Sequence, residues 1–383
     1  MVAMDFGAVL NGEFNAEDTG ETTTYGRVIL APWFSLPLGE ADLYVSAGMQ
    51  AYYKEELAFI PELYRLEFYF KLPSLSALSF RVGRIPWLDP SRFTLKGSFD
   101  GADILLDLGK IRFGAAALYT GFLYKDTAEI NISPGDPVDY GAVFDWGNFK
   151  DTYFAPPRVI AALYSEFPGL LFQRGNLYAG FLAQFDCSDA EEPFHTQYLL
   201  LRFTYTYKRF DLAAAGAVEL ENTKAEGFRT AYAFSLEGGW QTQLPFALKD
   251  RLSLGLRWAS GSGSYTGAFF PLIREAQGLA LKPLFSGIMI IKAQYEARLL
   301  PSLSAELGCR YFIRTDSTSF SDPDLEDNSY LVGAEADVSL LWVPFSDLSF
   351  SLAGGVFLPQ TGNALRSGTP IRWSLTLGTI FSF

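Results

Sequence analysis

The stretch RLSLGLRWAS, residues 251–260, carries the pattern that decides the fold. Leu252, Leu254, Leu256 and Trp258 occupy every second position, and arginine, serine or glycine lies between them. Successive side chains of a β-strand point to opposite faces of the sheet. Strict alternation therefore predicts a strand with one apolar and one polar face.

The same alternation recurs along the whole chain. In ELYRLEFYFKL (62–72), for example, Tyr64 and Leu66 fall on the apolar face and Arg65 on the polar one. We identify about 18 such segments of about 10–13 residues, near the length that a tilted strand needs to cross a bilayer. The expected strands are 3–13, 25–36, 41–52, 62–72, 75–86, 98–108, 110–121, 157–167, 176–186, 196–207, 209–221, 229–241, 250–260, 285–299, 302–314, 329–342, 346–358 and 370–383.

The connectors between these segments alternate between short and long. PSLS, LGK and VPFSD are short, whereas residues 122–156 and 261–284 are long. Tight turns on one rim and long loops on the other are typical of an outer-membrane barrel. We therefore predict an all-β fold: one transmembrane, antiparallel, up-and-down β-barrel over 1–383, with about 18 strands and 16 as the alternative. A large soluble β-sandwich or solenoid is the competing interpretation.

Composition narrows the class of protein. Hydrophobic residues make up 49% of the chain and charged residues 19%, yet no 18-residue stretch is apolar enough for a spanning helix. The net charge of −13 disfavours a nucleic-acid partner. The start, MVAMDFGAVL, lacks the basic and apolar regions of a secretory signal peptide, so export to a bacterial outer membrane requires that one was removed or omitted.

The polar face of the strands is expected to line a water-filled lumen, because about 18 strands leave an aqueous channel. Its charges are mixed, and in a wet lumen most of them would pair across strands. We expect the longest loop, 122–156, to fold inward as a constriction; an exposed surface loop is the alternative. The candidate pore-lining residues are Arg65, Glu67, Lys71, Arg81, Arg112, Arg158, Arg202, Arg257, Lys292, Glu296, Arg298, Arg310, Glu335 and Asp337.

Catalytic and metal-binding motifs are poorly represented. The single histidine, His195, lies beside acids with no identifiable nucleophile, and no P-loop or G-x-S-x-G motif occurs. DPDLED (322–327) has carboxylates that suit Ca²⁺ but lacks EF-hand spacing, so a solvated acidic loop is favoured. We therefore expect no enzyme activity, no cofactor and no resident metal.

The C-terminus reads Gly378-x-x-Phe381-x-Phe383. It resembles the C-terminal assembly signal of bacterial outer-membrane barrels, in which spaced aromatic residues follow a glycine and the chain ends in phenylalanine. The resemblance implies recognition by the barrel-assembly machinery. Leu377 departs from the polar residue that usually precedes the glycine.

Residues 80–121 resemble large outer-membrane porins of the alginate-export and related 18-stranded type. The matching features are Gly83-Arg84 at the end of one strand and Phe99-Asp100-Gly101 at the start of the next. The resemblance implies a passive channel for small hydrophilic or anionic solutes, although the balanced lumen charge departs from the basic pore of a polyanion exporter. A transporter of hydrophobic compounds and a structural or adhesion barrel are the alternatives, and the sequence leaves monomer and trimer equally open.

Overall fold

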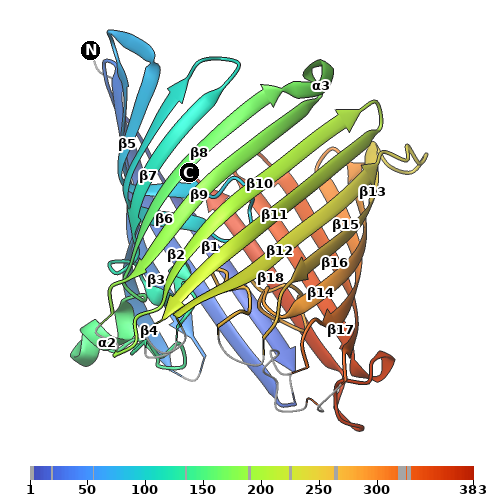
Figure 1. Cartoon of the computed structure of the whole chain (residues 1–383). Coiled ribbons are helices and arrows are strands. Elements are labelled where there is room, and N and C mark those ends of the chain that lie inside the picture. The colour runs from blue at the N-terminus through green and yellow to red at the C-terminus, as the bar shows by residue number, and fades with distance from the viewer. Residues whose placement is uncertain are drawn as a thin grey trace.

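A single closed sheet forms the body of the protein. The computed structural model describes residues 4–18, 20–54, 56–133, 136–188, 191–223, 227–262, 266–317, 325 and 329–383. Neighbouring strands in the chain pair antiparallel throughout, and β18 pairs with β1 to close the tube (Figure 1). The strands are β1 (Asp5–Asp18), β2 (Thr22–Leu38), β3 (Ala41–Tyr53), β4 (Leu57–Leu72), β5 (Leu75–Leu88), β6 (Lys96–Asp107), β7 (Arg112–Tyr119), β8 (Arg158–Gly169), β9 (Gly175–Asp186), β10 (His195–Tyr207), β11 (Phe210–Thr223), β12 (Gly227–Trp240), β13 (Lys249–Ala259), β14 (Ile288–Leu300), β15 (Leu303–Arg314), β16 (Leu331–Phe345), β17 (Leu348–Leu358) and β18 (Arg372–Ser382).

The predicted all-β barrel of 18 strands is thus confirmed, and the alternative of 16 strands is wrong. Closure lets every strand donate and accept ladder hydrogen bonds on both sides, which a bilayer interior requires. The helical segments in the described part of the chain are short: α1 (Lys125–Ala128), η1 (Trp146–Asn148), α2 (Phe149–Tyr153), α3 (Leu170–Gln173) and η2 (Pro359–Thr361). None of the helices described here has the length and apolar character to span a membrane.

The two rims of the tube differ. One, here called the short-turn rim, carries tight connections such as 73–74 and 346–347, and both ends of the described chain lie there (Figure 1). The opposite, long-loop rim carries the connections 89–95, 120–157 and 260–287. This matches the short–long alternation expected from the sequence.

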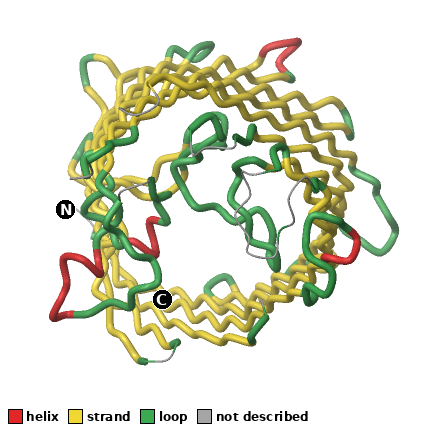
Figure 2. Tube along the Cα trace, turned by 60° about the horizontal axis from the view of Figure 1, so that its bottom comes forward, coloured by secondary structure: helices red, strands yellow, loops and turns green. Residues whose placement is uncertain are grey.

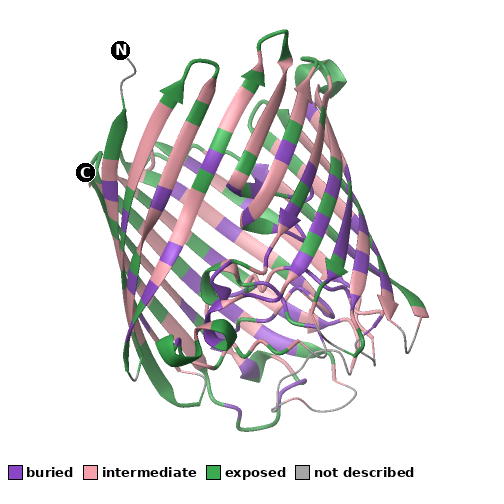
Figure 3. Cartoon of the chain, turned by 90° about the vertical axis from the view of Figure 1, so that its left-hand side faces the viewer, coloured by how far each residue is buried: buried purple, intermediate pink, exposed green. Residues whose placement is uncertain are grey.

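The two faces of the wall also differ. On β13, the Leu254 side chain is 64% exposed, whereas its neighbour Ser253 is 4% exposed. Figure 3 shows this alternation of exposed and buried positions along the strands. Arg257, on the same face as Ser253, packs against Phe285 of a segment inside the tube. The apolar stripe therefore faces outward and the polar stripe inward.

One residue departs from the expected face. Tyr64 was expected beside Leu66 on the apolar outer face, but it lines an internal cavity and its hydroxyl is buried. The reason is a register shift in the β3–β4 ladder: Ser46 pairs with Arg65 and Ala47 with Leu63, so Tyr64 has no opposite partner. Such a bulge re-aims one side chain without ending the strand.

Candidate functional site: a lumen narrowed by three inward segments

The first inward segment is the tip of the β5–β6 hairpin, residues 84–99. β5 bends at Gly83, whose φ is 118° and where a Cβ would lie 2.0 Å from the carbonyl oxygen of Leu66. Only glycine tolerates that backbone. Beyond the bend, Ile85 and Trp87 join a buried apolar cluster. Figure 2 shows that loop segments cross the interior of the tube.

Asp89 organises the loop at this tip. The carboxylate is fully buried and accepts hydrogen bonds from the backbone N–H groups of Arg92 (2.9 Å), Thr94 (3.0 Å) and Leu95 (2.9 Å). A carboxylate that accepts several backbone bonds stabilises a tight loop. The tip therefore has a defined shape inside the lumen.

The second inward segment is the β13–β14 loop, residues 260–287. Its Phe285 stacks on Phe93 of the hairpin tip with 5.7 Å between ring centroids, and Leu272 donates its backbone N–H to Thr94 (3.0 Å). Tyr198 of β10 donates its hydroxyl to the Phe270 carbonyl (2.6 Å). This loop thus packs inside the tube rather than extending from the rim.

Wall carboxylates hold the β13–β14 loop in place. Glu335 of β16 accepts the backbone N–H groups of Leu279 (2.7 Å), Ala280 (3.2 Å) and Leu281 (2.7 Å). Glu219 of β11 accepts the N–H of Phe270 at 2.8 Å. These hydrogen bonds tie one loop to two separate parts of the wall, on β11 and β16.

The third inward segment is part of the β7–β8 loop, residues 120–157. Ile130 forms a β-bridge with Ile273 of the β13–β14 loop, and the Asn131 amide donates to the Pro271 carbonyl (3.0 Å). Arg158, on β8 at the foot of the loop, is buried in ion pairs with Asp136 and Asp186. The loop is therefore anchored both to the wall and to the second segment.

Outside the strands, burial shifts several pKa values in the β7–β8 loop, including those of Lys125 and Tyr153. Burial lowers the pKa of the Lys125 ammonium, which donates to the carbonyls of Asp139 and Ala142. Burial, with the nearby Glu62 carboxylate as a further cause, raises the pKa of the Tyr153 hydroxyl to about 12. Tyr153 therefore keeps its proton and remains a hydrogen-bond donor at neutral pH.

A cavity of about 940 Å³, here called the inner chamber, is bounded by the hairpin tip and the wall. Arg81 of β5 pairs with Asp103 (2.7 Å), and Arg112 of β7 pairs with Glu166 (3.4 Å). Arg92 of the tip and Arg202 of β10 also line the chamber, and neither forms an ion pair within the described residues. The remaining lining includes Trp87, Tyr164 and Tyr178, so unpaired cations and aromatic rings share one space.

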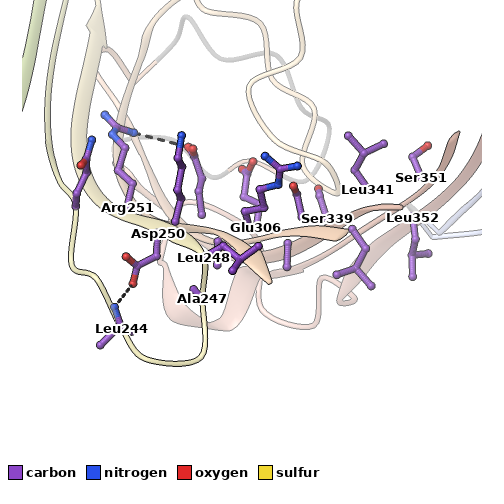
Figure 4. Close-up of a pocket in the computed structure, with 18 of the residues that line it drawn as sticks. Leu244, Ala247, Leu248, Asp250, Arg251, Glu306, Ser339, Leu341, Ser351 and Leu352 are labelled. Atoms are coloured by element: carbon purple, nitrogen blue, oxygen red, sulfur yellow. Dashed lines mark hydrogen bonds and ion pairs between the residues drawn. The ribbon is translucent and has the colours of Figure 1, made fainter. Parts of the chain in front are cut away.

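A second cavity of about 1040 Å³ lies towards the short-turn rim. Figure 4 shows its lining along one stretch of wall, from Asp250 and Arg251 through Glu306 and Ser339 to Ser351 and Leu352. Arg251 forms ion pairs with Asp211 (2.6 Å) and Glu237 (2.8 Å), so its charge is neutralised within the wall. We call this mixed-charge cavity the vestibule.

Ten of the fourteen candidate pore-lining residues fall into three groups. Arg81, Arg112 and Arg202 line the inner chamber; Glu296 and Arg298 line the vestibule; Arg158, Arg257, Arg310, Glu335 and Asp337 contact the inward segments or one another. Arg65 pairs with Glu67 (2.8 Å) and lies over the Tyr44 ring. Lys71 and Lys292 have no ion pair among the described residues.

Sequence reasoning missed the hairpin tip and the β13–β14 loop as inward segments. The signal was present: residues 269–285 contain FFPLI and LALKPLF, which are too apolar for a loop in water. In WLDPSRF (87–93), two aromatic residues flank a turn sequence in the same way.

The described residues offer few groups for catalysis or metal binding. No cluster of three or more His, Cys, Asp or Glu side chains with metal-ligand geometry occurs in the described ranges. The candidate Ca²⁺ loop 322–327 lies, apart from Leu325, outside the described residues. The His195 ring accepts the backbone N–H of Asp186 (3.1 Å), which gives it a structural role at the end of β10.

No protein-family model matches the chain, and no curated protein resembles it detectably in sequence. Solved structures of Pseudomonas aeruginosa outer-membrane porins do resemble it in fold. OpdK with vanillate has a TM-score of 0.65 at 12% identity, covering 99% of this chain and 98% of that one. OccK2 (OpdF) in complex with glucuronate has 0.64 at 11%, and OccK8 (OprE) has 0.65 at 13%, both with the same coverage.

At this identity the likeness establishes the fold alone. The chain has the 18-stranded barrel fold of these outer-membrane porins over nearly its whole length. The narrower resemblance to alginate-export porins is not supported by these neighbours.

Proposed function

We propose that the protein is a passive channel of the bacterial outer membrane through which small hydrophilic solutes diffuse. One observation carries the proposal: a closed tube with an apolar outer face holds a chamber lined by polar and charged groups. An 18-stranded barrel is wide enough for an aqueous path. The lipid bilayer of the outer membrane is then the partner of the outer face.

Small organic anions are the substrate class that we propose. Arg92 and Arg202 present guanidinium groups to the chamber, and Trp87, Tyr164 and Tyr178 present rings beside them. Guanidinium groups bind carboxylates well, and aromatic faces hold an apolar or planar body. Vanillate and glucuronate, the ligands of two neighbours in fold, are both carboxylates.

We propose further that the three inward segments together form the constriction, with 122–156 contributing through residues near Ile130. Support comes from their mutual contacts: Phe93 stacks on Phe285, and Ile130 pairs with Ile273. Because these segments pack on one another inside the lumen, they narrow the path for solutes but leave the inner chamber beside them open.

Planar-bilayer recording tests the proposal. In a KCl gradient we expect a reversal potential that favours chloride, and benzoate should reduce the current at millimolar concentration. Arg202→Gln should weaken both effects, whereas the matched control Arg298→Gln, towards the short-turn rim, should leave them nearly unchanged. A purified, folded protein that passes no ions, or an unchanged reversal potential in Arg202→Gln, would contradict the proposed function.

The assembly signal and the oligomeric state belong to the same proposal. We propose that Gly378, Phe381 and Phe383 guide insertion by the barrel-assembly machinery. In support, Phe381 and Phe383 stack at 5.4 Å on the strand that closes the barrel. Phe383→Ala should lower the folded yield in the outer membrane, and the mass of the detergent-solubilised protein should decide between monomer and trimer.

A further inference from the structure

The wall of the barrel is interrupted between β4 and β5. Their ladder runs from Leu72↔Leu75 to Leu66↔Arg84 and ends there. Beyond it, residues 57–65 of β4 pair within the described chain with β3 alone. The reason is the bend at Gly83, which carries the rest of β5 into the lumen. We call this interruption, bordered by 57–65 and 84–88, the seam.

Prolines mark both borders of the seam. Pro61 lies in β4 and Pro86 in β5, and both fall in the halves of these strands that do not pair with each other, although Pro61 still pairs with β3 and Pro86 with β6. Proline has no N–H to donate, so in sheets it is confined to edges and irregular positions. The sequence is therefore unsuited to a continuous ladder at this place.

Side chains close the seam instead of backbone pairs. Arg84 is 6% exposed and donates to the Leu63 carbonyl of β4 (2.7 Å), to Asp100 of β6 (2.7 Å) and to the Phe122 carbonyl of the β7–β8 loop (3.1 Å). Tyr153 donates its hydroxyl to the Pro61 carbonyl at 2.8 Å. One guanidinium and one phenol thus join three elements that no ladder joins.

An aromatic cluster of the β7–β8 loop completes the closure. Tyr124, Phe144 and Tyr153 form a buried cluster with Ala58 and Ile60 of β4. Figure 3, which faces this side of the barrel, shows α2 and its flanking loop beside the wall near the long-loop rim. Side chains packed in this way can move apart without breaking the hydrogen bonds of a β-ladder.

The inner chamber reaches the seam from inside. Its lining includes Leu63, Arg84 and Pro86 at the seam as well as Tyr178 and Arg202 on the opposite side. The Tyr64 hydroxyl, also on this lining, is buried and has no hydrogen-bond partner among the described residues. A buried polar group without a partner is costly and suits a polar ligand.

The outer border of the seam is apolar. Phe59 on the outer face of β4 is 51% exposed, and Phe122 of the β7–β8 loop is 61% exposed. Leu57, Val143 and Trp146 around the seam are also exposed. A wall position that is apolar outside and opens inside on a chamber with Arg92 and Arg202, unpaired among the described residues, fits a ligand with an apolar tail and an anionic head.

We propose that the seam is a side portal that connects the bilayer with the inner chamber, and that its ligand is a single-chain fatty carboxylate. The head would lie in the inner chamber near the Tyr64 hydroxyl and the guanidinium groups of Arg92 and Arg202, while the chain extends through the seam towards lipid. The chamber volume of about 940 Å³ accommodates the head and several methylene groups. This route is additional to the axial diffusion path and does not depend on it.

Reversible cross-linking of the seam tests the portal. The Thr127 hydroxyl of the β7–β8 loop donates to Glu62 of β4 at 3.0 Å, so a link between cysteines at these positions fixes the covering loop to the β4 border of the seam. The background is Cys187→Ser/Cys309→Ser, which removes the two free cysteines. Glu62→Cys/Thr127→Cys is then linked with a short bifunctional thiosulfonate, which dithiothreitol removes.

Labelling with palmitate that carries a diazirine beside its carboxylate supplies the readout. In proteoliposomes of the unlinked protein, we expect label on the chamber residues Trp87 and Tyr178, identified by mass spectrometry. The link should reduce this label at least tenfold, and dithiothreitol should restore it. A link between Thr204→Cys and Ala213→Cys, register partners in the continuous β10–β11 ladder, should change nothing.

Label confined to lipid-facing residues such as Phe59, or chamber label that the seam link does not reduce, would overturn the portal. Ion current through the same linked protein reports on the axial channel separately. A conducting protein without chamber label refutes the portal alone, whereas chamber label without ion current refutes the proposed axial function alone.

Discussion

The barrel wall is closed in different ways at β10–β12 and at β4–β5. The β10–β11 ladder is in register from His195↔Asn222 to Tyr207↔Phe210, and β11–β12 continues from Phe210↔Trp240 to Thr223↔Gly227. Between β4 and β5, pairing stops at Leu66↔Arg84 and side chains complete the closure. A continuous ladder needs only alternating strands and a tight turn, whereas the seam needs particular residues from three elements.

A single bend accounts for both the constriction and the seam. Because β5 turns inward at Gly83, Trp87 and Phe93 reach the lumen and narrow it. The same turn removes the partner of residues 57–65, which the β7–β8 loop then covers. Changes that affect the hairpin tip should therefore act on pore size, and changes at Arg84 on wall integrity. The predictions below separate these two effects.

Removal of the hairpin tip should have the largest effect. Replacing residues 89–95 by two glycines deletes Asp89 and Phe93, so the tip can no longer pack on Phe285. We expect single-channel conductance to rise roughly twofold or more, because an unplugged barrel of this size is an open aqueous channel. The matched control replaces 171–173, an exposed turn on the short-turn rim, by two glycines. Unchanged conductance would show that the tip does not limit the path.

Loss of the Glu335 carboxylate should have the second-largest effect. Glu335→Ala removes three backbone acceptor contacts from the β13–β14 loop, each worth about 1.5–3 kcal/mol when one partner is charged. We expect frequent current fluctuations and faster protease cleavage within 260–287. Glu306→Ala, a wall carboxylate with no contact to the loop in the described structure, is the control. A current without added fluctuations in Glu335→Ala would mean that apolar packing alone holds the loop in place.

Arg84 and Arg81 provide a matched pair on one strand. Both form ion pairs at 2.7 Å, but Arg84 also bonds β4 and the β7–β8 loop, whereas the partners of Arg81 lie on β5 and β6. We expect Arg84→Ala to lower the free energy of unfolding by about 3 kcal/mol, and Arg81→Ala by less. Urea unfolding in detergent or lipid measures the difference. Equal losses would indicate that the seam needs no cross-link from Arg84.

The strand pattern was sufficient to predict the barrel because alternation is a local property. The stripe Leu252–Leu254 and the short turns specify faces and rims without reference to distant residues. All 18 expected segments correspond to strands, with boundaries that differ by a few residues. Tyr64 was misplaced because a bulge depends on how β3 and β4 register, which alternation does not reveal.

The interior was harder to predict because it depends on contacts between distant loops. Phe93 and Phe285 are far apart in sequence, and neither loop sequence by itself indicates that the two rings stack. The candidate lumen charges, by contrast, follow from the alternation of inward and outward positions along a strand, as for Arg112 and Glu335. The alternation does not reveal that Glu335 accepts hydrogen bonds from a loop backbone. Length drew attention to 122–156, whereas the apolar composition of 269–285 was the better signal of an inward loop.

The smallest predicted effect concerns a single hydroxyl at the seam. Tyr153→Phe keeps the ring in the aromatic cluster but removes the hydrogen bond to the Pro61 carbonyl. The carbonyl cannot recruit a ladder N–H, since residues 57–65 have no partner on that side, so we expect a loss of about 1 kcal/mol. The control Tyr140→Phe removes a hydroxyl bond to Ile130 in the same loop but away from the seam. If the portal is real, Tyr153→Phe should also increase chamber labelling by the diazirine palmitate, and Tyr140→Phe should not. Equal labelling in both variants would show that the Tyr153 hydroxyl does not keep the seam closed.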